Sequence, residues 1–249
     1  PMSITENLLS NLPGRPVSVR DVRIGPFWTL VWTAAGAGLA STMREQHALH
    51  GEPVISGAGD LLTHSAQELA QLLRSNSVME RALGMAAVNA LLSIDEGRLT
   101  ERNASEEICL RGVNKRVVVV GHFPFLPDVK RRVGKLDVLE LTPGPGDLPA
   151  EAAEEVIPEA DVVAITGTSL VNGTFDQLIA LCAPQAYVLV LGPTTPLSPC
   201  LFDHGVDRVH IHLGMLGHGL ELVGDLEDFV HDELHVAQGR RVGRHGVTP

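Results

Sequence analysis

Residues 160–174 read ADVVAITGTSLVNGT, a continuous apolar run that ends in a loop of threonine, serine, asparagine and glycine. Three further runs have the same form: VVVVGHFPFLP at 117–127, LDVLELTPGPGD at 136–147 and AYVLVLGPTTPLSP at 186–199. Short β-branched runs without polar alternation are typical of strands buried on both faces, as in a parallel sheet. In such a sheet ligands bind outside the carboxyl ends of the strands. The sequence therefore predicts a parallel sheet with a site at the loops that follow its strands.

The first part of the chain follows a different pattern. Two strands joined by a Gly-Pro turn are predicted at 18–34, and two helices at 65–93, the second of them apolar on two sides. A polar stretch from Asp95 predicts a linker. We therefore expect an α/β protein with an α+β domain over residues 1–112 and a doubly wound, mainly parallel domain over residues 113–249.

The composition restricts the partners and the location of the protein. A formal net charge of −11 argues against nucleic acid or an anionic membrane as the main partner. No apolar run approaches the length of a membrane span, and the start of the sequence lacks the pattern of a secretory signal. The three cysteines are widely spaced, which disfavours a disulfide framework. We predict a cytoplasmic protein with a small-molecule or metal-complex ligand; the subunit count, monomer or homo-oligomer, stays open.

The loop at 166–174 is the strongest candidate for a binding site. It leaves a buried strand and opens a helix, so that backbone amides and hydroxyl groups converge at a positive helix end, which suits a carboxylate, a phosphate or a metal-bound anion. Helix capping is the alternative, and it explains Asn172 and Thr174 but not the other hydroxyl groups. The candidate ligand-binding residues of this loop are Thr166, Gly167, Thr168, Asn172 and Thr174.

The loop at 192–199 has a proline at every third position. Prolines fix the backbone and lower the entropy lost on binding, which fits the wall of a preorganised site. The alternative is a rigid connector in which Thr195 caps a short helix. Because neighbouring strand ends would make the two loops walls of one cleft, Gly192, Thr194 and Thr195 are further candidates for ligand binding.

The loop that begins at Gly121 lies where a dinucleotide-binding fold places its glycine fingerprint. Glu140 follows Gly121 by 19 residues, near the spacing of the acidic residue that holds a ribose. The later glycines of the fingerprint are absent, and Phe123 and Pro124 block a pyrophosphate, so a nicotinamide dinucleotide is disfavoured while a smaller nucleoside stays open. His122 and Glu140 are the candidate catalytic residues, with a hydrogen-bonded structural role as the alternative for His122.

The histidine-rich segment 204–218 is a weaker candidate for a metal site. His210 and His212 would share one face of a strand, but no cysteine cluster or paired helical histidines support them, so we favour solvated or core-edge histidines. Asn89 is a polar group on a helix that should be covered. It either bonds a neighbouring backbone group or faces the cleft from the first domain.

Four motifs together resemble a poorly characterised family described as "putative heavy-metal chelation" proteins: GMAAVNALL at 84–92, VVVVGHFPF at 117–125, the run at 143–174, and LGPTTPLSPCLFDHGVD at 191–207. The similarity extends from about Gly36 to Asp207. It implies a domain like the enolase N-terminal domain, a Rossmann-like second domain, a cleft between them and a heavy or transition metal ion as a candidate cofactor. Carried over by motif, the residues of that cleft are His122, Glu140, Thr166, Thr168, Asn172, Thr194 and Thr195, with Asn89 nearby.

Two interpretations of function follow. The first is the binding or processing of a small anionic or metal-chelating ligand, with heavy-metal chelation as one form, in an interdomain cleft. The alternative is an enzyme with a nucleoside-type cosubstrate, such as a small-molecule transferase. No motif for a serine or cysteine nucleophile or for a phosphate-cradling lysine is present. The sequence therefore leaves open whether the protein is an enzyme.

Overall fold

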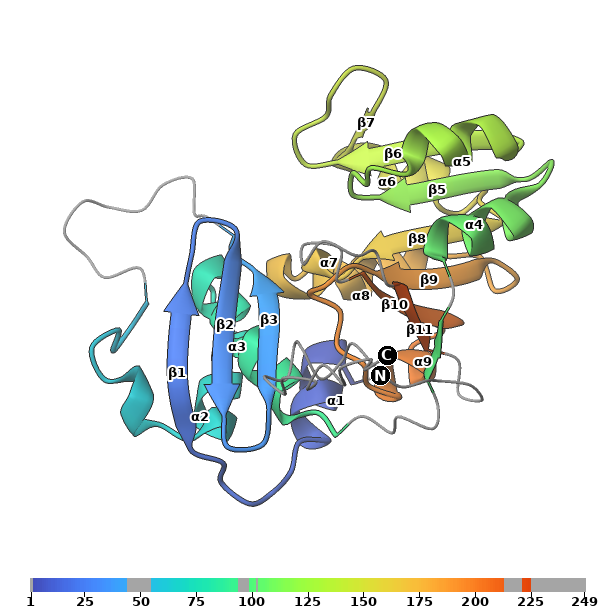
Figure 1. The fold of residues 1–249 in the computed structure, drawn as a ribbon. Helices are drawn as coiled ribbons and strands as arrows, with labels where there is room; N and C mark the ends of the chain where they lie inside the picture. Colours follow the sequence, from blue (N-terminus) through green and yellow to red (C-terminus); the bar gives the residue numbers. More distant parts are fainter. Residues whose placement is uncertain (1, 44–54, 94–98, 102, 213–220, 225–249) are drawn as a thin grey trace, which may run out of the picture. The chain divides into compact units, whose positions relative to one another are not determined.

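The structure is a computed structural model that describes residues 2–43, 55–93, 99–101, 103–212 and 221–224. Contacts divide the described residues into two compact units, one within residues 12–92 and the other made of residues 2–11 together with the described residues from 93 onward. The first unit holds a three-stranded sheet and the second an eight-stranded sheet (Figure 1). No helix in the described ranges is both long and apolar enough to cross a membrane.

The smaller unit is an antiparallel sheet with helices packed on one face (Figure 1). Its strands pair in sequence order and are β1 (Val19–Ile24), β2 (Trp28–Thr33) and β3 (Ala37–Ser41). Its helical elements are η1 (Leu61–Thr63), α2 (Ala66–Ala70), η2 (Gln71–Arg74) and α3 (Val78–Leu91). The α+β character predicted for the N-terminal part is confirmed, while its likeness to the enolase N-terminal domain stays a prediction.

Helix α3 packs closely against its neighbours because two glycines let backbones approach. A Cβ atom at Gly84 of α3 would lie 2.3 Å from the amide nitrogen of Leu73 in η2. A Cβ atom at Gly38 of β3 would lie 2.2 Å from the carbonyl oxygen of Ala86. Both apolar sides of α3 are consequently buried, as the sequence pattern predicts.

The larger unit is built on a mainly parallel sheet with the strand order β4-β11-β10-β9-β8-β5-β6-β7. From β10 to β7 all neighbours are parallel, whereas β11 pairs antiparallel with β10 and with β4. The six parallel strands follow the doubly wound order 3-2-1-4-5-6, and the predicted fold class is confirmed. The strands are β4 (Leu99–Glu101), β5 (Arg116–Val120), β6 (Lys135–Glu140), β7 (Leu148–Pro149), β8 (Val162–Thr166), β9 (Tyr187–Leu191), β10 (Arg208–His212) and β11 (Glu221–Gly224).

Helices cover both faces of this sheet. Helices α4 and α5 pack together on one face, and α6 and α8 on the other (Figure 1). The helical elements are α1 (Ile4–Ser10), α4 (Ala104–Gly112), α5 (Leu126–Arg132), η3 (Ala150–Ala152), α6 (Ala153–Val156), α7 (Thr168–Asn172), α8 (Phe175–Leu181) and α9 (Cys200–Asp203). A further helix expected near residues 226–236 lies outside the described residues.

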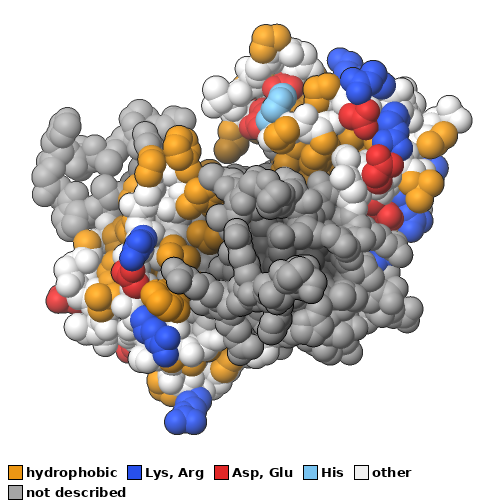
Figure 2. Space-filling view, viewed as in Figure 1, with side chains coloured by type: hydrophobic (Ala, Val, Ile, Leu, Met, Phe, Trp, Pro, Cys, Tyr) orange, Lys and Arg blue, Asp and Glu red, His pale blue; other side chains and the backbone are white. Residues whose placement is uncertain are grey.

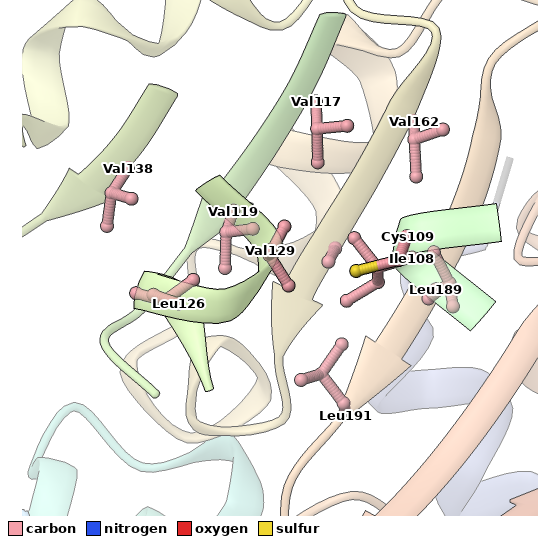
Figure 3. Packing of buried hydrophobic residues seen from close by; sticks show 11 residues of the cluster. Ile108, Cys109, Val117, Val119, Leu126, Val129, Val138, Val162, Leu189 and Leu191 are labelled. Carbon is pink, nitrogen blue, oxygen red and sulfur yellow. The ribbon is translucent and has the colours of Figure 1, made fainter. Parts of the chain in front are cut away.

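The apolar runs form the core of the larger unit because their side chains face helices on both sides of the sheet. Figure 3 shows Val119 of β5, Val129 of α5 and Ile108 of α4 directed toward one another, and all three are fully buried. Helix α4 thus packs with the parallel sheet. The contacts accordingly divide the chain after residue 92, whereas the domain boundary was predicted after residue 112.

Glu107 of α4 anchors a polar network against the sheet. The Tyr187 hydroxyl donates to Glu107 Oε1 (2.9 Å), as does Nε of Arg111 (3.1 Å), and Arg208 Nε donates to the Tyr187 hydroxyl (3.0 Å). Burial acts to raise the pKa of Glu107, but the hydrogen bonds from Tyr187 and Arg111 and the nearby Arg208 charge outweigh it, so the pKa is lowered. The ionised carboxylate therefore stabilises the fold.

Replacing Glu107 by glutamine is expected to lower the free energy of unfolding at pH 7 by about 1–2 kcal/mol, because charge-assisted hydrogen bonds are lost. A lowered folded-state pKa means that this stabilisation is complete above the unfolded-state pKa and is lost as the pH falls through the folded-state value. Urea unfolding between pH 7 and pH 3 should show the difference between wild type and variant shrinking below about pH 4.5. The exposed Glu155→Gln serves as control, and a difference that stays constant with pH would contradict the role of the charge.

Candidate functional site

A pocket of about 330 Å³ lies at the carboxyl ends of β5, β6 and β8. Strand β5 has β6 on one side and β8 on the other, so this is the point where the strand order reverses direction. Doubly wound sheets bind ligands in the crevice at such a switch point. The pocket therefore lies at the edge of the sheet where the sequence predicts a site.

The lining combines a polar arc with apolar walls. The polar side chains belong to His122, Glu140, Thr166, Thr168, Ser169, Asn172, Thr174 and Gln177. The remaining lining is Gly121 with the apolar residues Val120, Phe123, Leu139, Leu141, Ala150, Ala153, Leu178 and Leu181. Of the predicted ligand-binding residues, the pocket thus brings together Gly121, His122, Glu140, Thr166, Thr168, Asn172 and Thr174. Ser169 and Gln177 were not predicted, although Gln177 stands one helical turn after Thr174.

The residues after β8 form a short helix, α7, where a loop was predicted. The Thr166 and Thr168 hydroxyl oxygens lie 3.0 Å apart and share a hydrogen bond. Asn172 Oδ1 accepts from both the amide (3.1 Å) and the hydroxyl (2.7 Å) of Thr174. Because the Thr174 hydroxyl turns to Asn172, it does not cap α8, and the capping role considered for it is wrong. Among the described residues the side-chain Nδ2 of Asn172 has no acceptor, so it stays available as a donor at the pocket.

The proline loop packs behind the threonine segment instead of lining this pocket. A Cβ atom at Gly167 would lie 2.3 Å from the hydroxyl oxygen of Thr195 and 2.7 Å from its amide nitrogen. Thr194 and Thr195 are each 1 % exposed, and the Thr195 hydroxyl has no hydrogen-bond partner within the described parts of the chain. Gly192, Thr194 and Thr195 thus lie outside the lining, so a ligand role for them stays a prediction.

His122 is the most exposed of the candidates, with 61 % of its side chain accessible, and its Nδ1 lies 3.5 Å from Asp147 Oδ2. The same carboxylate oxygen accepts from the amide of Gly144 (3.0 Å), which fixes the turn after β6. Sequence reasoning missed Asp147, although an aspartate that follows PGPG signals a side chain bonded to its own turn. His122 therefore places an exposed imidazole in the lining of the pocket, close to the Asp147 carboxylate.

Asn89 belongs to the smaller unit. Its Nδ2 donates to the carbonyl oxygen of Leu39 in β3 (2.8 Å), which is the backbone bond considered for it. Of the histidine-rich segment, His210 is 1 % exposed on β10, and Nε2 of His204 lies 3.2 Å from Asn7 Nδ2 in α1. The side chain of His212 and the whole of His218 lie outside the described residues.

The electrostatics of the pocket are simple. Of the residues that the structure describes, Glu140 is the one carboxylate in the lining, and neither lysine nor arginine lines the pocket. Nowhere in the described part of the chain do three or more histidine, cysteine, aspartate or glutamate side chains gather to hold a metal ion. A transition metal ion bound by a protein usually takes three or four such ligands. The described residues therefore do not fit a bare heavy-metal ion.

A second, shallower hollow lies on the outer surface of α4 and is lined by Glu106, Leu110 and Arg132, among others. Arg132 is held there by both carboxylate oxygens of Glu106, at 2.7 Å each. Figure 2 shows acidic and basic side chains interleaved on this side of the larger unit. Exposed ion pairs of this kind form a solvated surface, so the hollow offers no free charge to a ligand.

Comparisons with known proteins agree with this architecture. Residues 104–212 match the DUF364 family and residues 5–92 the DUF4213 family, and both are described as "putative heavy-metal chelation". An uncharacterised protein of Methanocaldococcus jannaschii is 27 % identical over 181 residues, which are 70 % of this chain and 68 % of that protein.

Two solved structures of DUF364-family proteins of unknown function share the fold. The one from Desulfitobacterium hafniense has a TM-score of 0.75 at 23 % identity, over 89 % of this chain and 97 % of that chain. The one from Pyrococcus horikoshii has a TM-score of 0.66 at 20 % identity, over 88 % and 97 %. With both units of the chain matched, the protein belongs to the family described as "putative heavy-metal chelation".

Proposed function

We propose that the pocket at β5, β6 and β8 binds a small, neutral or cationic organic molecule, and that any metal handled there is carried by this molecule. The observation that carries the proposal is the charge of the lining, which among the described residues has the Glu140 carboxylate and hydrogen-bonding groups but no lysine or arginine. A multiply charged anion would lose its hydration there without gaining a cationic partner.

From the sequence, an anionic ligand was one of the predicted classes, because a helix that begins in the loop at 166–174 was expected to present its positive end to the site. Helix α7 has only five residues, and the hydroxyl of Ser169 already donates to the carbonyl oxygen of Thr166 (2.7 Å). A single short turn supplies little of the dipole that longer helices offer. The family description supports a chelating ligand, and an amine or imidazole chelator satisfies both the description and the charge of the pocket.

The residues suit binding of such a molecule in a defined orientation. Glu140 accepts hydrogen bonds or pairs with a cation on the β6 side, and Thr168 and Asn172 offer neutral polar groups on the β8 side. Apolar side chains between them, such as Leu139 and Leu178, cover the body of the ligand. His122 and Glu140 stay the candidates for proton transfer if the ligand is processed, and a contribution from Asn89 across an interdomain cleft stays a prediction.

Three chelators of different charge test the proposal, namely histamine, histidine and citrate. We expect histamine or histidine, at about ten times its dissociation constant, to raise the melting temperature of the full chain by about 3 °C or more. Glu140→Gln and Thr168→Val should both reduce this shift. Glu140→Gln should melt like wild type without ligand, whereas Thr168→Val loses the hydrogen bond with the Thr166 hydroxyl and should melt slightly lower. Scanning fluorimetry measures both quantities.

Glu155→Gln, which removes an exposed charge on α6 outside the pocket, is the matched control and should keep the full shift. Stabilisation by citrate that grows in Glu140→Gln would overturn the charge argument. Stabilisation by nickel chloride alone that is lost in His122→Asn would show that the pocket binds the bare ion instead.

A further inference from the structure

We propose that the molecule bound in this pocket is a purine nucleoside without phosphate groups, or a larger molecule that contains such a nucleoside, and that its ribose hydroxyls bind Glu140. This inference rests on the proposed function of the pocket. Glu140 is the last residue of β6, which lies beside β5 as the second strand of the doubly wound order. In that topology an acidic residue at the end of the second strand accepts hydrogen bonds from ribose hydroxyls.

The Glu140 carboxylate is free to do so. Its Oε2 accepts a bond from the adjacent amide of Leu141 (3.2 Å), and among the described residues its Oε1 has no hydrogen-bond partner. Two carboxylate oxygens with vacant lone pairs match the two donors of a vicinal diol. Glu140 and Gly121 are far apart in the sequence but line the same pocket, because β5 and β6 are paired neighbours that both end there.

Apolar side chains from the segments that follow β6 and β7 line the same pocket as Glu140. Leu141 follows it directly and is 63 % exposed, and Ala150 and Ala153 come from η3 and α6, which follow β7. Small and branched apolar groups on either side of a slot cover the faces of a planar base. The purine would therefore lie between Leu141 and the two alanines, over the end of the third parallel strand.

The structure disfavours phosphate on the other side of the ribose. The ring of Phe123 lies at the ends of β5 and β9, with Cε2 and Cε1 at 3.4 and 4.0 Å from Cβ positions built on Gly121 and Gly192. It covers the strand ends that a pyrophosphate approaches in dinucleotide-binding folds. Thr168 and Asn172, which line the pocket beyond β5, fit a neutral 5′ substituent. A pocket of about 330 Å³ is also at the small end of the range for ligand sites, roughly 300–1,000 Å³.

Calorimetric titration of the full chain with adenosine, 2′,3′-dideoxyadenosine, adenine and AMP tests the inference. We expect adenosine to bind at least tenfold more tightly than dideoxyadenosine and than AMP. Glu140→Gln should weaken adenosine at least tenfold and leave adenine unchanged, while Glu155→Gln changes neither. The dideoxyadenosine comparison uses wild-type protein, so it keeps the test valid if Glu140→Gln folds poorly.

The proposal of a nucleoside ligand would be overturned by equal binding of adenosine and dideoxyadenosine, by tighter binding of AMP than of adenosine, or by no binding of adenosine. If adenosine fails while histamine or histidine binds in a Glu140-dependent way, the inference is wrong and the proposed function stands. If neither adenosine nor a chelator binds, both are wrong.

Discussion

Gly38→Ala is expected to lower the free energy of unfolding by about 3 kcal/mol or more. The new Cβ atom would lie 2.2 Å from the carbonyl oxygen of Ala86 and 2.2 Å from the amide nitrogen of Ala90, both in the backbone of α3. No rotamer change relieves a clash with backbone, so α3 has to move away from β3. Overpacking usually costs about 1–3 kcal/mol, and the upper end applies where backbone must shift.

Urea or thermal unfolding of the full chain measures the effect, and Gly14→Ala is the matched control in the same unit. A Cβ atom at Gly14 meets nothing within 4 Å, so this variant should stay within about 0.5 kcal/mol of wild type. Equal stability of the two variants would show that α3 and β3 do not pack as closely as described. Such a result would also remove the reason why a glycine stands in the middle of β3.

The parallel sheet could be predicted because its strands are buried on both faces. Residues such as Val117 to Val119 are fully buried in β5, and unbroken β-branched runs have few other stable arrangements. The place of α4 could not be predicted in the same way. Its sequence is half polar, and only long-range packing of Ile108 and Cys109 against β5 and β8 assigns it to the larger unit. The antiparallel strands β4 and β11 have three and four residues, so they form only through pairing with neighbouring strands and their own sequences do not predict them.

The candidate site, like the fold, could be predicted from the sequence only in part. Strand order brings His122, Glu140 and Thr166 together, because adjacent parallel strands end at the same edge of the sheet. Which side of a loop faces the pocket depends on its backbone path, which residue types do not reveal. The proline loop shows this, since Thr195 turns toward Gly167 and away from solvent. The Asp147 contact with His122 likewise depends on how the turn after β6 reverses.

Gly167→Ala is expected to lower the free energy of unfolding by about 2–3 kcal/mol and to weaken ligand binding at α7. Its Cβ atom would lie 2.3 Å from the Thr195 hydroxyl oxygen and 2.7 Å from the Thr195 amide nitrogen. Helix α7 begins at the next residue, so relief of the clash displaces Thr168 from the pocket. Urea unfolding and the ligand-induced melting shift measure the two effects.

A double-mutant cycle with Thr195→Ala separates the clash from other effects. Thr195→Ala alone should stay within about 1 kcal/mol of wild type, because it removes a buried hydroxyl that bonds to none of the described residues. In the double variant the hydroxyl clash is gone but the amide contact remains, so we expect partial rescue of Gly167→Ala and a coupling of about 1 kcal/mol. Strict additivity of the two substitutions would mean that the proline loop does not support the threonine segment. In that case residues 192–195 would not serve to support α7, and binding a ligand directly would be the remaining role for them, because nothing else in the described structure accounts for their burial against Gly167.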